Sequence, residues 1–168
     1  MVSIETPATP RALDEVRDLL RAFLRWQQGR NAGNTQQLEH YFDAASYEEE
    51  VRSLPGEYAA PEGALLLARI DGEAAGCVGL RRLDAGACEM KRMFIYPRFQ
   101  GLGLGRALGA AIIDAGRAAG YAMMRLDTSV RQVEAQALYA SLGFTRIPPY
   151  YDLPPAVRDW LVFMERSL

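Results

Sequence analysis

Alternating glycines in the middle of the chain restrict its fold more than any other sequence feature. An apolar stretch is followed by Gly101, Gly103 and Gly105, and a stripe of apolar residues with helical spacing begins at once. The first N–H groups of a helix lack intrahelical acceptors and carry a partial positive charge. Glycines let such a backbone approach an anion without a Cβ clash. This strand–turn–helix is therefore predicted to bind a phosphate or pyrophosphate, with Arg106 and Arg98 as candidates for charge-assisted contacts.

Two common phosphate-binding motifs fit this turn poorly. A P-loop needs Gly-Lys-Ser/Thr after the glycines, and none follows. A dinucleotide-binding fingerprint would account for a downstream strand that ends in Asp127, but Arg106 and Leu108 stand where its third glycine belongs in the two registers. A tight turn that merely needs glycine is a further alternative, although the alternating glycines exceed what one turn requires.

The other patterns predict one α+β domain around a single sheet. Thr9 followed by Pro10 is a typical helix start, and helical apolar spacing continues to about Gln28. Ser46 with Glu49 fits a capping box for a shorter helix. Strands are expected over 2–5, 64–70, 74–83, 88–96, 121–128, 144–147 and 160–166, and helices over 104–119 and 131–142. The order is helices, an antiparallel meander, and then alternating strands and helices.

Composition excludes several classes of function. A chain of 168 residues, 49% of them apolar, suits one compact domain, and a net charge of -2 argues against nucleic acid as a partner. Cys77 and Cys88 form no disulfide framework, and with His40 as the one histidine no metal site is expected. The N-terminus does not resemble a secretory signal, and no apolar run is long enough to span a membrane. We expect a cytoplasmic protein with no membrane partner.

The glycine segment resembles the signature of the GNAT acetyltransferase superfamily, Gln/Arg-x-x-Gly-x-Gly/Ala, and reads Gln100-Gly-Leu-Gly-Leu-Gly105 here. Glu89–Ile95 is similar to the strand that precedes this signature, and Ala137–Phe144, with Tyr followed by Gly-Phe, is similar to a later helix of the family. The resemblance covers about residue 64 to the C-terminus. It implies a GNAT-like domain over 1–168, with a variable helical part over 1–60, a coenzyme-binding core over 64–168, and a mixed, mostly antiparallel sheet with a V-shaped splay, flanked by helices.

The resemblance also implies acetyl-CoA as the co-substrate. In the family the pantetheine arm lies in the splay and pairs with the end of the strand, and the pyrophosphate binds the amides of the turn. The coenzyme-binding residues implied are Met93, Phe94, Ile95, Gln100, Gly101, Leu102, Gly103, Leu104, Gly105, Arg106 and Gln132. Gln132 stands where many members have Asn, so the longer side chain is a departure from the pattern.

The chemistry implied is direct attack of a neutral amine on the thioester through a tetrahedral oxyanion. This reaction needs a donor for the oxyanion, here a backbone N–H near Ile95, and an acid for the leaving thiolate. Tyr139 corresponds to a tyrosine that lies beside the coenzyme sulfur. A phenol with a reference pKa of about 10 stays protonated at neutral pH and can donate that proton. The alternative is that Tyr139 is an ordinary core tyrosine.

Two carboxylates are alternative general bases. Glu89 precedes Ile95 by six residues, which predicts the same face of the strand, and it is favoured over Asp127, which precedes Tyr139 by twelve. Either carboxylate could instead pair with a cation: Lys91, Arg92 or Arg125. A reaction without a dedicated base, in which water removes the proton, also stays open.

The acceptor is predicted to be a primary amine of a small or amino-acid-like molecule. Tyr150 and Tyr151, in a proline-rich loop over 148–155, are predicted to rim its pocket. Trp160 is expected to be a core aromatic residue. Two alternatives remain: acetylation of protein N-termini or lysines, and a non-catalytic CoA-binding sensor. Because many relatives dimerise, a homodimer is also an option.

Overall fold

A seven-stranded sheet lies at the centre of the computed structural model, which describes residues 1–168. The strands are β1 (Val2–Glu5), β2 (Ala64–Ile70), β3 (Glu73–Arg82), β4 (Ala87–Ile95), β5 (Met123–Ser129), β6 (Thr145–Ile147) and β7 (Leu161–Ser167). Their order across the sheet is β1-β2-β3-β4-β5-β7-β6, and every neighbouring pair is antiparallel except β4 and β5. The predicted mixed, mostly antiparallel sheet is confirmed.

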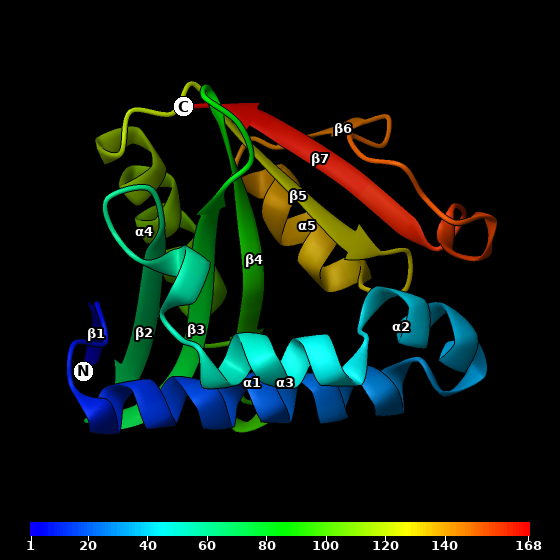
Figure 1. Ribbon diagram of the computed structural model, residues 1–168. Coiled ribbons are helices and arrows are strands. Elements are labelled where there is room, and N and C mark those ends of the chain that lie inside the picture. The colour runs from blue at the N-terminus through cyan, green and yellow to red at the C-terminus, as the bar shows by residue number, and fades with distance from the viewer.

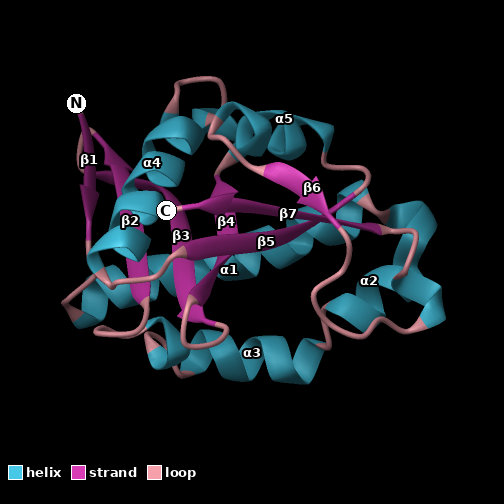
Figure 2. Cartoon of the chain, turned by 90° about the horizontal axis from the view of Figure 1, so that it is seen from above, coloured by secondary structure: helices cyan, strands magenta, loops and turns pink.

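Helices cover both faces of this sheet (Figures 1 and 2). They are α1 (Pro10–Arg30), α2 (Thr35–Tyr41), α3 (Ala44–Arg52), α4 (Leu104–Ala118) and α5 (Val133–Ser141). The first three helices share one buried apolar cluster with one face of the sheet, and α4 and α5 share a second cluster with the other face. None of the helices is long and apolar enough to cross a membrane.

The parallel strands β4 and β5 separate soon after they meet. They pair only where Ala87–Glu89 lies beside Met123–Arg125, and beyond these residues β4 has no partner on that side. Figure 1 shows the two strands diverging from the top of the view toward α1 and α2. The expected V-shaped splay is therefore present, and it leaves one edge of β4 open.

A β-bulge interrupts β4 where it pairs with β3. The register shifts opposite Cys77–Gly79, and Arg92 adopts a φ of 60°. Phe94 consequently belongs to the apolar cluster of α1, whereas Ile95 packs with the α4 cluster. Side chains before the bulge alternate between the faces of the sheet in the opposite phase to those after it. The Glu89 side chain therefore lies on the face that α1 covers, opposite to Ile95. The prediction that they share a face was wrong, because counting by two fails across a bulge.

Side-chain caps set the starts of two N-terminal helices. The Thr9 hydroxyl accepts a hydrogen bond from the Ala12 N–H at 3.1 Å, which confirms the predicted start of α1. The capping box predicted at Ser46 was wrong, because Asp43 caps α3 and its carboxylate accepts a hydrogen bond from the Ser46 N–H at 2.9 Å. Asp and Ser are comparable N-caps, so a local pattern does not choose between them.

Candidate active site

The glycine turn presents a row of unused backbone donors. Gly101 and Gly103 have φ values of 79° and 81°, and Gly103 caps α4. The first helical hydrogen bond at this end runs from the Ala107 N–H to the Gly103 carbonyl. The N–H groups from Gly101 to Arg106 donate to no acceptor in the chain. Such a row at a helix N-terminus can bind an anion.

The glycines serve different purposes. A Cβ on Gly101 or Gly103 would meet no atom within 4 Å, so these residues supply the left-handed conformation and keep the space outside the turn open. A Cβ on Gly105 would lie 3.0 Å from the Leu138 side chain, so Gly105 lets α4 pack closely against α5. The exposed side chain of Leu102 leaves the row of N–H groups uncovered.

The two arginines proposed for this turn have partners in the chain. Arg98 forms an ion pair with Glu73. Arg106 donates from one Nη to the Ser141 hydroxyl at 3.1 Å. The Arg106 guanidinium has further N–H groups and stays beside the turn, whereas Arg98 is directed toward β3. Of the two, Arg106 is the better candidate for a phosphate contact.

The open edge of β4 presents the main chain of alternate residues. The Tyr96 N–H donates to the Ala75 carbonyl at 3.0 Å, and Phe94 lies opposite Cys77 in the same register. Because backbone groups alternate along a strand, those of Phe94 point toward β3 and those of Met93 and Ile95 point into the gap. The prediction that the Phe94 main chain pairs with a pantetheine arm therefore does not fit the register.

Phe94 and Gln100 hold the end of β4 in place through different contacts. The Phe94 ring packs 5.4 Å from the Phe23 ring, measured between centroids, and holds β4 against α1. The Gln100 side-chain amide donates to the Ile95 carbonyl at 3.2 Å. Gln100 thus fixes the turn to the strand, and the Ile95 N–H and the Met93 main chain remain available in the gap.

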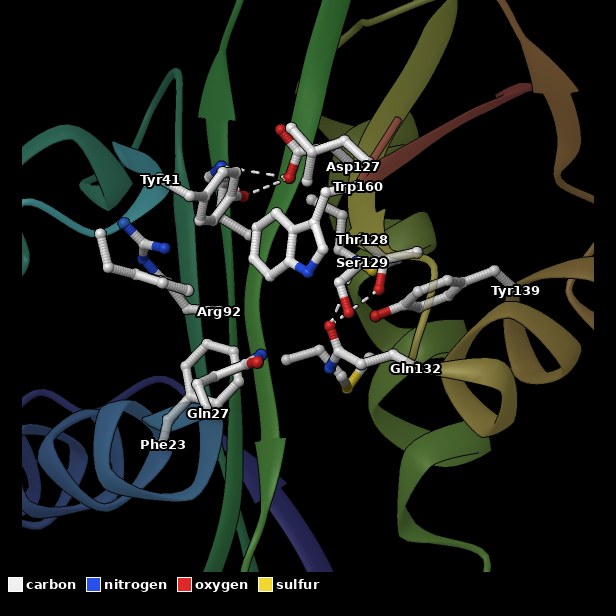
Figure 3. Close-up of a pocket in the computed structure, with 15 residues that line it drawn as sticks. Phe23, Gln27, Tyr41, Arg92, Asp127, Thr128, Ser129, Gln132, Tyr139 and Trp160 are labelled. Atoms are coloured by element: carbon white, nitrogen blue, oxygen red, sulfur yellow. Dashed lines mark hydrogen bonds and ion pairs between the residues drawn. The ribbon is translucent and has the colours of Figure 1, made fainter. Parts of the chain in front are cut away.

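A small cavity of about 40 Å³ lies in the splay between β4 and β5 (Figure 3). Its walls combine apolar and polar side chains, namely Phe23, Gln27, Tyr41, Phe42, Met90, Lys91, Arg92, Met93, Asp127, Thr128, Ser129, Gln132, Tyr139, Trp160 and Leu161. We call it the inner cavity. Its walls come from α1, α2, β4, β5, α5, residues that flank these helices, and the start of β7 with the residue before it, so the fold gathers them from most of the chain.

Tyr139 enters this inner cavity from α5. Its hydroxyl has no hydrogen-bond partner in the chain, and burial together with the nearby Asp127 carboxylate raises the pKa of Tyr139 above its usual value. A phenol in this state keeps its proton at neutral pH and can give it to a stronger base. The structure therefore gives Tyr139 a position compatible with the role implied by the family resemblance.

Gln132 lies just before α5, and its side chain is partly occupied. Its Oε1 accepts hydrogen bonds from the Thr128 hydroxyl at 3.0 Å and from the Ser129 N–H at 3.4 Å. The Nε2 group donates to nothing in the chain. The longer amide can therefore stabilise the turn after β5 and still donate to a carbonyl in the inner cavity.

Asp127 is a buried carboxylate with several donors around it. It accepts hydrogen bonds from the hydroxyls of Tyr41 and Tyr151, the latter at 2.7 Å, and the Lys91 ammonium lies 3.6 Å away. Burial alone would raise the pKa of Asp127, but Lys91 and the two hydroxyls together hold it below its usual value. Asp127 is thus a carboxylate at neutral pH and a weak proton acceptor.

Glu89 is also buried and paired. Its carboxylate accepts hydrogen bonds from Arg81 Nε at 2.7 Å and from the Tyr150 hydroxyl at 2.5 Å, and Lys91 Nζ lies 3.9 Å away. Lys91 therefore lies between the two candidate bases. The other cations considered as partners are engaged elsewhere, Arg92 with Glu50 and Arg125 with Glu165.

A larger cavity of about 450 Å³ adjoins the inner one, and we call it the outer cavity. Glu89 and Asp127 both line it, together with Tyr150 and Tyr151, which were predicted to rim the acceptor pocket. The two cavities share wall residues from α2, β4, β5 and the start of β7, namely Tyr41, Lys91, Arg92, Asp127 and Leu161. An amine in the outer cavity would thus approach the inner cavity past the Asp127 carboxylate.

Lys91, Tyr41 and Trp160 are among the wall residues that were not predicted as site residues. Lys91 had a signal in the sequence, because a lysine inside an apolar strand requires a buried partner. Tyr41 fitted a helical apolar stripe, and Trp160 fitted a core aromatic position. The sequence around these two residues does not indicate that they lie beside the gap between β4 and β5.

Comparison with known proteins decides the family. The sequence model described as the Acetyltransferase (GNAT) family matches residues 15–144. The chain belongs to the GNAT family. It is similar to an uncharacterized N-acetyltransferase of Schizosaccharomyces pombe, with 32% identity over 91% of this chain and 88% of that protein. It is also similar to the IAA acetyltransferase of Azospirillum brasilense, with 36% identity over 66% of this chain and 71% of that protein.

Solved structures of GNAT proteins share this fold. A GNAT acetyltransferase from Staphylococcus aureus superposes with a TM-score of 0.75 at 20% identity, covering 99% of both chains. The PaiA N-acetyltransferase from Thermoplasma acidophilum, solved in complex with coenzyme A, has a TM-score of 0.72 at 16% identity and covers 100% of this chain and 99% of that one. The family places the protein among the acyl-CoA-dependent N-acetyltransferases, with a CoA-based co-substrate.

Proposed function

We propose that this GNAT protein transfers the acetyl group of acetyl-CoA to a primary amine of a small or amino-acid-like molecule. The observation that carries the proposal is the row of N–H groups from Gly101 to Arg106, which donate to nothing in the chain. The row follows the open edge of β4, after a short helical turn over Pro97–Phe99. A diphosphate bound there would direct the pantetheine arm along that edge, toward the inner cavity.

The chain supplies groups for each step of a direct transfer. The pantetheine amides would pair with the main chain of Met93 and Ile95, which brings the thioester to the inner cavity. The amine nitrogen attacks the carbonyl carbon, the carbonyl electrons move to oxygen, and a backbone N–H near Ile95 stabilises the oxyanion. When the C–S bond breaks, Tyr139 gives its proton to the thiolate, and the nitrogen of the new amide returns its extra proton to the Tyr139 phenolate.

The two carboxylates fit amine binding better than proton removal. Lys91 and the neighbouring hydroxyls lower the pKa of Asp127, and Glu89 already accepts hydrogen bonds from Arg81 and Tyr150. A carboxylate with a lowered pKa, such as Asp127, attracts a protonated amine but removes its proton slowly. We therefore assign the two carboxylates to holding the acceptor, and we assign to water the removal of the proton before attack.

The form of the outer cavity supports a small acceptor. Residues of α2 and of the loop that carries Tyr150 and Tyr151 line the same cavity, so the two segments bound it from opposite ends of the sequence. The volume of the outer cavity, about 450 Å³, also suits a small molecule. Relatives named IAA acetyltransferase and N-acetylaspartate synthetase, the second 30% identical over 71% of this chain, agree with small acceptors.

A turnover screen tests this function. Acetyl-CoA-dependent thiol release should be measured with amino acids, polyamines, aminoglycosides and peptide N-termini, each against a reaction without amine. We expect turnover with at least one small amine. Turnover with peptides alone would establish a protein acetyltransferase instead. Tight binding of acetyl-CoA in calorimetry without turnover of any amine would establish a CoA-binding sensor, and either result would contradict the proposal.

A further inference from the structure

The indole N–H of Trp160 is a buried donor without a partner. Trp160 is only 5% exposed, and its Nε1 is shielded from solvent without a hydrogen bond to any group of the chain. Buried polar groups are nearly always paired, because leaving one unpaired costs about 1–3 kcal/mol. The fold tolerates this cost at a position that lines the inner cavity.

A second unpaired group lines the same cavity. The Ser129 hydroxyl oxygen is also shielded and has no partner, although Ser129 is only 2% exposed. Figure 3 shows the Trp160 indole in the middle of the gap, with its nitrogen on the side where Ser129, Gln132 and Tyr139 lie. The two unpaired groups therefore face the same space and are not two separate packing defects.

The position of the indole is fixed by its surroundings. The Trp160 N–H of the main chain donates to the Val157 carbonyl at 3.1 Å, and the Trp160 carbonyl accepts from the Val130 N–H at 2.9 Å. The ring meets the Tyr41 ring edge-on at 5.9 Å between centroids. The hydrogen bonds fix the main chain of Trp160 and the Tyr41 ring supports its side chain, so the indole is preorganised for a ligand.

We propose that the Trp160 indole N–H donates a hydrogen bond to the acetyl carbonyl oxygen of the bound thioester, and this rests on the proposed function. An indole N–H is donor-only and keeps its proton, so its partner is an oxygen that accepts hydrogen bonds. A thioester held between Met93 and Tyr139 would supply such an oxygen, because both residues line the same cavity as Trp160.

The indole then acts on the oxygen that gains charge. The amine nitrogen forms the new C–N bond, and the C=O electron pair moves to the oxygen that Trp160 holds. The pair returns to carbon as the C–S bond breaks. The ammonium has lost one proton to water before the attack, and the thiolate takes the proton of Tyr139. The nitrogen of the new C–N bond then returns its extra proton to the Tyr139 phenolate. A fixed neutral donor in a dry site is worth more to this developing charge than to the ground-state carbonyl.

Trp160→Phe tests the proposal, because it removes the N–H and keeps an aromatic ring. We expect kcat with the best amine to fall by about 10²–10³-fold, as for loss of one oxyanion donor. The Kd of CoA, which has no acetyl group, should stay unchanged in calorimetry. Trp26→Phe is the matched control, since Trp26 packs on Phe23 and Phe94 outside both cavities and should keep the wild-type kcat.

A more conservative replacement covers the case in which Trp160→Phe fails to fold. 3-Benzothienylalanine at this position replaces the N–H by sulfur and keeps the shape of the indole, and it should lower kcat as Trp160→Phe does. An unchanged kcat in either variant would overturn the proposal, and so would a loss confined to the KM of the amine, which would assign the donor to the acceptor. Absence of turnover in the wild-type protein would instead overturn the proposed function.

Discussion

At the scale of single residues, the Tyr139 hydroxyl is the group whose removal should slow the chemistry most selectively. Burial raises the pKa of Tyr139, so the phenol is protonated at working pH. Tyr139→Phe removes that proton and should lower kcat by about 10²–10⁴-fold, the usual contribution of a general acid. Calorimetry should give the wild-type Kd for acetyl-CoA. Equal losses of kcat and affinity would show that Tyr139 only supports binding.

Tyr121→Phe is a suitable control for this comparison. The Tyr121 hydroxyl donates to the Glu62 carbonyl at 2.7 Å and lines neither cavity. The variant should lose about 1 kcal/mol of stability with its hydrogen bond and keep the wild-type kcat. A fall in kcat similar to that of Tyr139→Phe would mean that loss of any buried phenol affects turnover.

The Asp127 carboxylate should make stability depend on pH in the acid range. Because its folded-state pKa lies below the unfolded value, the carboxylate stabilises the fold above the unfolded pKa, and this stabilisation is lost as pH falls through the folded pKa. Asp127→Asn should cost about 1–3 kcal/mol at neutral pH by leaving buried donors poorly paired. The difference from wild type should shrink as pH falls below about 4, where the carboxyl of the unfolded chain begins to protonate, and on through the lower folded-state pKa.

Urea unfolding at a series of pH values measures this difference. Asn at position 127 has the size of Asp and cannot titrate, so the comparison isolates the charge. A difference in free energy of unfolding that stays constant from neutral to strongly acidic pH would contradict a carboxylate with a lowered pKa.

At the scale of elements, a comparison of two glycines tests whether the turn between β4 and α4 binds the coenzyme or only needs a left-handed backbone conformation. Gly103 and Gly120 have φ values of 81° and 89°, lie near opposite ends of α4, and have open space where a Cβ would stand. Alanine at either position should cost about 1–2 kcal/mol, because the left-handed conformation is strained for residues with a Cβ. Only Gly103→Ala should weaken acetyl-CoA binding in calorimetry, because its methyl group enters the space before the free N–H groups. Equal coenzyme affinity in the two variants would place the diphosphate elsewhere.

The elements themselves were predictable where their signals are local. The alternating glycines, the helical stripe after them and the Thr9-Pro10 start each depend on neighbouring residues, and the structure agrees with them. The bulge in β4 was not predictable in this way. Arg92 adopts its unusual φ where it forms an ion pair with Glu50 and lies over the Tyr47 ring, so residues distant in sequence surround the conformation.

The candidate site was likewise predictable only where its residues belong to a local motif. The turn and Tyr139 belong to short motifs. The cluster of Tyr41, Lys91 and Asp127 joins α2, β4 and β5, and its hydrogen bonds and ion pairs link segments far apart in the chain. The spacing of residues within one segment does not predict such a contact. The bulge also placed Glu89 on the face of the sheet opposite to the expected one.

At the scale of the whole molecule, the sheet is built as two parts joined along a short seam. β4 and β5 pair over only Ala87–Glu89 and Met123–Arg125, so the space beyond that seam is available to a ligand. Residues of α1, of α2 and of the segment before β7 line this space. The coenzyme and the acceptor would therefore enter from different ends and meet at the inner cavity.

The most direct test of the central claim is to follow the amide groups of the turn by NMR. Acetyl-CoA should shift the amide proton resonances from Gly101 to Arg106 and slow their exchange with solvent, because the diphosphate accepts their hydrogen bonds. S-acetylpantetheine, which lacks the diphosphate, should leave these amides unchanged. Turnover of acetyl-CoA with an amine while the amides stay unshifted would contradict the account.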